Sequence, residues 1–98
     1  MKFELEISES ALEDLDCFKK AEQNEILDVI DEQLTATPLT PTRNRKPLRP
    51  NDLAAWEMRI GLYRVFYDVD EQKNKVLIKA IGCKEHNKLF IRGQEYEL

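Results

Sequence analysis

The chain has 98 residues, of which 42% are hydrophobic and 35% are charged, and its formal net charge is −4. This size predicts one domain, residues 1–98, with one modest core, and the composition excludes a disordered chain. No apolar run approaches the roughly 20 residues that a membrane helix needs, and the first residues lack the apolar core of a signal peptide. Cys17 and Cys83 lie far apart, without metal-ligand or disulfide-framework spacing, which favours a reduced, cytoplasmic setting.

The first third of the chain predicts a strand followed by an acidic helical hairpin. Residues 3–7 alternate strictly between apolar and acidic side chains, which indicates a half-buried strand. Ser8 or Ser10 can cap the helix that follows, and Ser10 with Glu13 fits a capping box. The apolar stripe of this short helix consists of Leu12, Leu15 and Phe18. A second helix is predicted from about residue 21 to residue 34, with a buried face made of Ile26, Val29, Ile30 and Leu34.

The next stretch, residues 35–50, contains all four prolines. Proline lacks a backbone N–H and fixes φ, so this stretch cannot be a continuous helix or a central strand, and we expect a connection. It holds the basic residues Arg43, Arg45, Lys46 and Arg49, with no acid up to residue 51. Residues 1–34 carry three Lys against eleven acids, whereas residues 35–98 carry twelve Lys or Arg against eight acids. The second part of the chain is therefore the part expected to attract phosphate.

Three further strands are predicted, at residues 56–60, 62–69 and 76–81. Polar residues 70–74 form a hairpin turn between the last two, Gly82 ends the third, and the tail from residue 83 shows weak periodicity. The expected order is β-α-α-β-β-β. This is an α+β fold in which a two-helix hairpin packs on one face of a mainly antiparallel sheet.

The strand pattern places several cations on the sheet face opposite the helices. The basic set consists of Arg59, Arg64, Lys79 and Lys84. Arginine binds phosphate in a planar, bidentate manner, and clustered cations stabilise charge that develops on a reacting phosphate. Spacing alone favours the simpler interpretation of a solvated sheet face with exposed charges.

Other candidates are single residues. His86 is the only histidine, and its imidazole suits acid–base chemistry near neutral pH, although most lone histidines in polar tails are surface residues. Cys83 has no partner spacing typical of thiol catalysis, so we interpret it as structural. Phe66 shares a strand face with Arg64 and is the better candidate for stacking on a base, while Tyr63 and Tyr67 are expected in the core.

The order of elements together with three local patterns resembles the RelE/ParE superfamily, the toxins of prokaryotic toxin–antitoxin pairs. The patterns are Pro47-Leu48-Arg49, the two strands WEMRI (56–60) and LYRVFY (62–67), and the tail IGCKEHNKLF (81–90). The resemblance covers nearly the whole chain and implies the same α+β fold. It also implies a toxin of a type II toxin–antitoxin system.

RelE-like members are implied to cleave mRNA in the ribosomal A site by attack of the nucleotide's own 2′-hydroxyl, with no metal or other cofactor. Carried over by position, Arg64 matches a phosphate-binding arginine and Arg59 a basic position on the preceding strand. Lys84 matches the residue that stabilises the pentavalent phosphate, and His86 a second polar position of the same tail. These four residues form the expected catalytic set. The residues expected to contact RNA are Lys46, Arg49, Phe66 and Phe90.

Two departures weaken the enzymatic interpretation. Glu57 stands where RelE-like enzymes often carry a lysine base, and Phe90 stands where they often carry a catalytic tyrosine. Two alternatives therefore stay open: a ParE-like inhibitor of DNA gyrase without chemistry of its own, and a protein that has lost catalysis and only binds its antitoxin. The implied partners are an antitoxin encoded nearby, in a hetero-oligomer, and either the ribosome with mRNA or DNA gyrase.

Overall fold

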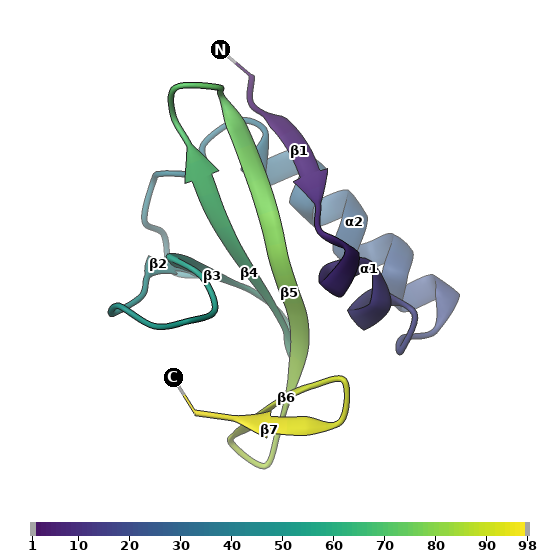
Figure 1. Ribbon diagram of the computed structural model, residues 1–98. Coiled ribbons are helices and arrows are strands. Elements are labelled where there is room, and N and C mark those ends of the chain that lie inside the picture. The colour runs from purple at the N-terminus through teal and green to yellow at the C-terminus, as the bar shows by residue number, and fades with distance from the viewer. Residues whose placement is uncertain (1, 98) are drawn as a thin grey trace.

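The computed structural model describes residues 2–97, which form two helices and seven strands (Figure 1). The helices are α1 (Glu9–Leu15) and α2 (Lys20–Leu34). The strands are β1 (Glu4–Ile7), β2 (Arg45–Pro47), β3 (Trp56–Ile60), β4 (Tyr63–Asp70), β5 (Lys75–Glu85), β6 (Lys88–Ile91) and β7 (Gln94–Tyr96). The predicted α+β class and the two-helix hairpin are confirmed, and β2, β6 and β7 are additions to the predicted order.

One sheet contains all seven strands. The order β2-β3-β4-β5-β6-β7 is antiparallel throughout, and β1 pairs in parallel with the first half of β5, from Glu4 opposite Lys75 to Ile7 opposite Ile78. Both helices lie on one side of the sheet, and the β6–β7 hairpin crosses its far end (Figure 1). The sheet is therefore mainly antiparallel, as predicted.

The start and the buried face of α1 differ from the prediction. Ser8 caps the helix by accepting a hydrogen bond from the Ala11 N–H at 3.1 Å, so the capping box at Ser10 is wrong. The face against the sheet consists of Ala11, Asp14 and Leu15, and Leu12 is 49% exposed. The predicted stripe of Leu12, Leu15 and Phe18 is therefore wrong at Leu12, because Ala11 and the carboxylate of Asp14 occupy the buried face beside Leu15. In α2, Ile26, Ile30 and Leu34 are buried as predicted, with Val29 half-buried.

The connection between α2 and β3 contains one short edge strand. Residues 45–47 pair with β3 and form the edge strand β2, which ends at Pro47. Proline is tolerated there because a strand at the edge of a sheet has a partner on one side only. Arg45 is buried on the helix side and donates from Nη1 to the Thr37 hydroxyl at 3.1 Å. The prediction that residues 35–50 form neither a continuous helix nor a central strand is confirmed.

Two hydrophobic clusters flank the sheet. The larger one fills the space between helices and sheet and includes Met58, Val65 and Tyr67. The smaller one, here called the second core, lies on the opposite face and consists of Ala54, Phe66, Ala80, Leu89 and Ile91. It attaches the loop of residues 48–55 and strand β6 to the sheet, so the face opposite the helices is only partly solvated.

β5 continues through Gly82 to Glu85, and the predicted strand end at Gly82 is wrong. A Cβ atom at Gly82 would lie 2.5 Å from the Phe90 carbonyl oxygen and 2.9 Å from Ile91 Cγ1. Glycine is therefore required by the close approach of β6, not by a turn. The absence of a side chain at this position lets the β6–β7 hairpin fold across the sheet.

Gly82→Ala is expected to lower the free energy of unfolding by about 1–3 kcal/mol, because the added methyl group forces β6 away from β5. Gly93→Ala separates the steric effect from backbone strain, because a Cβ there meets nothing within 4 Å and any cost comes from its φ of +78° alone. Urea denaturation followed by circular dichroism measures both. Equal stability of wild type and Gly82→Ala would contradict the close approach.

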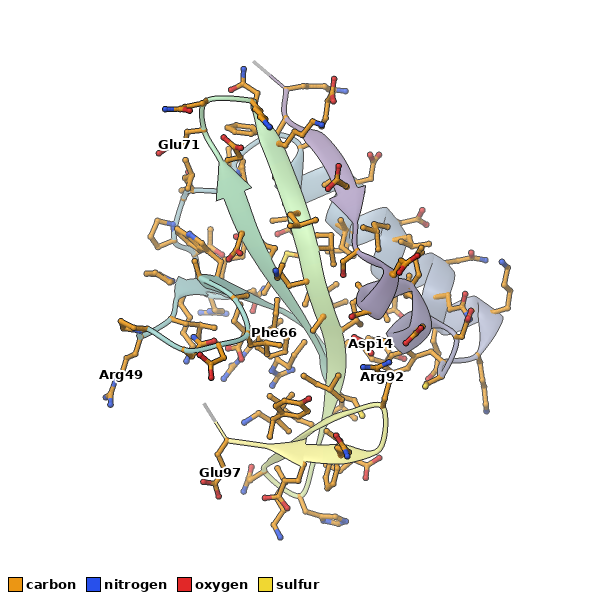
Figure 2. All side chains as sticks on the ribbon, viewed as in Figure 1. Asp14, Arg49, Phe66, Glu71, Arg92 and Glu97 are labelled. Atoms are coloured by element: carbon orange, nitrogen blue, oxygen red, sulfur yellow. The ribbon has the colours of Figure 1, made fainter. Side chains whose placement is uncertain are left out.

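The tip of the β6–β7 hairpin is anchored to α1 (Figure 2). Arg92 forms ion pairs with Glu13 and with Asp14, whose Oδ1 lies 2.9 Å from the arginine Nε. Asp14 is 1% exposed, and its Oδ2 accepts the Ile81 N–H at 2.9 Å. This bond occupies the edge of β5 between its contacts with β1 and with β6. Asp14 thus takes the place of a strand partner at that point.

The same carboxyl makes stability depend on pH. Burial raises the pKa of Asp14 above its ordinary 3.8, and the Ile81 N–H and Arg92 oppose that rise. A raised pKa in the folded state means that the protonated form favours folding below the unfolded pKa, and this contribution is lost as pH rises through the folded pKa. Wild type should therefore lose stability relative to Asp14→Asn between about pH 4 and pH 7. Paired urea titrations at both pH values test this, and a constant difference would contradict it.

Candidate active site

A cavity of about 840 Å³ opens on the sheet face opposite the helices. Strands β3, β4 and β5 form its floor, β2 and the following loop form one wall, and the β6–β7 hairpin forms the other. Five of the eight residues predicted for the site line it: Lys46, Arg49, Arg59, Arg64 and Lys84. Arg49 stands on the loop at the outer rim and points away from the sheet (Figure 2).

Two arginines stand directly opposite each other on the cavity floor. Arg59 on β3 pairs in register with Arg64 on β4, and both side chains line the cavity. Like charges in this arrangement repel each other and destabilise a sheet. Within residues 2–97, no carboxylate lies within ion-pair distance of Arg59, Arg64 or Lys84. A bound anion would relieve the repulsion, so the floor is suited to phosphate.

Arg64 is held in place by the backbone of the β3–β4 turn. Its Nη1 donates to the carbonyl oxygens of Gly61 and Tyr63, each at 2.9 Å, and Gly61 has a φ of 58° that favours glycine. The side chain is only 7% exposed. Burial and, secondarily, Arg59 lower the pKa of Arg64, while Glu57 opposes that change. A guanidinium stays charged under such shifts, so this buried cation is oriented before any ligand binds.

Glu57 is the acidic residue on the cavity floor. It is 8% exposed, and its Oε2 lies 3.8 Å from Nζ of Lys46 on β2. It shares the strand face of Arg59, two residues along β3. In the sequence Glu57 is a departure from the family pattern, and the structure places it beside the cations of the cavity floor.

Three of the predicted residues lie outside the cavity wall. Phe66 is fully buried in the second core, so the prediction that it stacks on a base is wrong, because no face of the ring is accessible. Phe90 is half-buried, and strand alternation turns it away from Leu89 and Ile91 on the cavity side. His86 is exposed in the two-residue β5–β6 turn with a φ of 51° and does not line the cavity.

Lys79 does not line the cavity with the other members of the predicted basic set. The register passes from Ala80 opposite Phe66 to Ile78 opposite Tyr67, so Lys79 is the extra residue of a β-bulge. Its side chain lines a second, smaller hollow beside Asp68 instead. Strict alternation from Lys84 would put Lys79 on the helix side of the sheet, and the bulge returns it to the side of Arg64, outside the cavity.

Tyr96 was missed by sequence reasoning. It lies on β7 opposite Leu89, lines the cavity, and is 38% exposed. Within residues 2–97 its ring is the only aromatic ring on the cavity wall. The tail has too little periodicity to predict a strand there, so only the folded hairpin reveals this position.

Two other kinds of catalytic site were considered in the described residues: a reactive thiol at Cys83 and a metal-binding cluster. Burial raises the pKa of the Cys83 thiol, which disfavours the reactive thiolate and agrees with a structural role. Across the described residues, no three His, Cys, Asp or Glu side chains are grouped to hold a metal ion.

Comparison with known proteins assigns the family. A family model described as the ParE toxin of the type II toxin–antitoxin system parDE matches residues 5–87, most of the chain. The chain belongs to this family. It is therefore a toxin of a type II toxin–antitoxin system, and the resemblance to the RelE/ParE superfamily is confirmed. No curated protein matches it.

Two solved structures share the fold of this toxin. The RelBE2 toxin–antitoxin complex from Mycobacterium tuberculosis matches with a TM-score of 0.73 and 22% identity, covering 86% of this chain and all of the other. The archaeal RelE–RelB complex from Pyrococcus horikoshii OT3 matches with a TM-score of 0.70 and 20% identity, covering 88% and 99%. At these identities the likeness concerns the fold. In the part of the toxin that the structure describes, neither helix has the length and apolarity needed to cross a membrane.

Proposed function

We propose that this toxin is an mRNA endoribonuclease that acts on the ribosome in the cytoplasm and thereby inhibits translation. The observation that carries the proposal is the Arg59–Arg64 pair on the cavity floor. Lys84 lines the same cavity, and within residues 2–97 no carboxylate is ion-paired to any of the three. Such a set binds one phosphate group and stabilises the charge that develops on it during cleavage.

Each cavity residue has a distinct place in this proposal. Arg64, fixed by two carbonyl groups, orients its remaining N–H groups toward the scissile phosphate, and Arg59 and Lys84 neutralise the added charge of the pentavalent state. Lys46 and Arg49 at the rim contact neighbouring phosphates of the strand. Tyr96 supplies the accessible ring on which an unpaired base can stack.

Message cleavage on programmed ribosomes tests the enzyme directly. Purified toxin should cut the ribosome-bound message, and heat-denatured toxin should not. The cut ends should be a 2′,3′-cyclic phosphate and a 5′-hydroxyl. An uncut message at saturating toxin would contradict the proposal.

A second candidate function is inhibition of DNA gyrase, favoured by the match to the ParE family. In that case the toxin should block supercoiling of plasmid DNA by gyrase and leave ribosome-bound message intact. Activity in neither assay, with antitoxin binding retained, would identify a toxin that has lost its activity.

We also propose a cognate antitoxin encoded nearby, forming a hetero-oligomer with the toxin. The two structures of similar fold are both toxin–antitoxin complexes. Residues 35–92 carry twelve cations against six acids, so an acidic or amphipathic segment that folds on binding would suit this surface. The product of the neighbouring gene should copurify with the toxin. Clean separation of the two at low salt would count against this partner.

A further inference from the structure

We infer that Arg92, at the tip of the β6–β7 hairpin, is a positioning residue for the cavity: its ion pairs with α1 hold the hairpin so that the Tyr96 ring stands on the cavity wall. The inference rests on the proposed endoribonuclease function, because it assigns to Arg92 the placement of the ring on which a base stacks. Arg92 does not line the cavity, so it acts through the hairpin and not on the RNA.

The hairpin has few other attachments to the sheet. β6 pairs with β5 through three residue pairs, and within residues 2–97 β7 pairs with β6 alone. Leu89 and Ile91 pack in the second core and fix β6, whereas all three residues of β7 are exposed. A two-stranded ribbon is only marginally stable by itself. The position of β7 therefore depends on what holds the turn that leads into it.

The turn itself runs against the local backbone preference of its first residue. Arg92 and Gly93 form the two-residue connection between β6 and β7, with φ values of 50° and 78°. Positive φ at both positions is the type I′ pattern, in which Asn or Gly is favoured at the first position. Arginine has a Cβ atom and takes this conformation at a cost. A residue that breaks a local rule in this way is held by contacts from outside the turn.

Those contacts are ion pairs with two neighbouring acids of α1. The Arg92 Nε lies 2.9 Å from Oδ1 of Asp14, and Glu13 pairs with the same guanidinium. Asp14 is buried, and its other oxygen accepts the Ile81 N–H, so β5 fixes the carboxylate that receives Arg92. Solvent screens a pair with a buried member less than it screens an exposed pair. Figure 2 shows Asp14 and Arg92 next to each other where α1 meets the hairpin.

The anchored turn determines where the Tyr96 ring lies. Tyr96 is three residues beyond Gly93, roughly 10 Å along β7. It pairs with Leu89 and lines the cavity. With the turn fixed, β7 follows one path along the cavity and the ring is in place before RNA binds. Without the ion pairs the ring occupies several positions, and binding must order it at an entropic cost.

Hydrogen exchange measures the anchoring directly. In Arg92→Ala, the amides of residues 88–96 should exchange faster than in wild type, whereas those of β3 and β4 should keep their wild-type rates. Asp14→Asn keeps an acceptor for the Ile81 N–H but loses the charge that Arg92 pairs with, so it should speed exchange in the same segment. Arg92→Lys keeps the charge and should lie near wild type. Arg43→Ala removes an exposed arginine before β2 and should match wild type.

Cleavage on programmed ribosomes tests the functional consequence. In Arg92→Ala, the toxin concentration that gives the half-maximal single-turnover rate should rise by about 3–10-fold, less than in Tyr96→Ala, which loses the stacked base entirely. The rate at saturation should stay close to wild type, because Arg59 and Arg64 are unchanged. In a Tyr96→Ala background, Arg92→Ala should raise the half-maximal concentration no further, because the ring that it positions is gone.

The outcomes separate this inference from the proposed function. Unchanged exchange in Arg92→Ala overturns the inference, whatever the cleavage assay shows. Faster exchange with an unchanged half-maximal concentration also overturns it, because the hairpin would then move without effect on RNA binding. Losses that add in the double variant would show that Arg92 does not act through Tyr96. If wild type leaves the message uncut, the proposed function fails together with the role in RNA binding, and exchange at residues 88–96 still decides whether Arg92 holds the hairpin.

Discussion

Arg64→Ala is expected to reduce message cleavage by about 10²–10³-fold and to abolish growth arrest, because it removes the preoriented donor to the scissile phosphate. Arg64→Lys should lie between wild type and alanine, since lysine keeps the charge but loses the planar, bidentate contact. The measurement is the single-turnover rate on programmed ribosomes, with growth after induction as the cellular readout.

Arg43→Ala is the matched control for this experiment. It removes an arginine that is exposed in the connection before β2 and does not line the cavity. Cleavage by this variant should match wild type. Equal loss in both variants would mean that the overall charge of the toxin matters and that the cavity does not. Growth arrest that persists in Arg64→Ala would favour the gyrase mechanism.

Phe66→Ala is expected to lower the free energy of unfolding by about 3–5 kcal/mol, because it removes the largest side chain of the second core. The loss should loosen both walls of the cavity, since Ala54 of the loop and Leu89 of β6 pack in that cluster. Phe66→Leu keeps most of the volume and should cost less than about 1.5 kcal/mol. Urea denaturation measures all three proteins.

The Phe66 variants distinguish a ring that stacks on a base from a ring that packs in the core. A base-stacking residue, when truncated, weakens RNA binding and leaves the fold intact. If Phe66→Ala unfolds at the wild-type urea concentration but binds ribosomes more weakly, the buried position would be contradicted. If stability falls and the more stable Phe66→Leu cleaves normally, the ring belongs to the core.

The pattern of side chains along the chain was sufficient for most of the fold. Strict alternation located β1, β3 and β4 because each has one face on the helices and one on the cavity or solvent. Spacing of three to four located the buried face of α2. The same alternation placed Arg59 and Arg64 on one face, and the register confirms them as a cross-strand pair.

The composition of the cavity depended on contacts that a linear pattern does not encode. The bulge at Lys79 changes which face a side chain occupies, and it arises from pairing between two strands. Gly82 signals a strand end in sequence, yet it allows β6 to cross closely over β5, which brings Tyr96 to the cavity. The second core buries Phe66 because distant segments cover the sheet there. The sequence by itself determined that Arg59 and Arg64 share a face, since that follows from regular strand geometry. Only the tertiary structure decided which cations share a cavity with Glu57 and Tyr96, because that depends on how a hairpin and a loop close over the sheet.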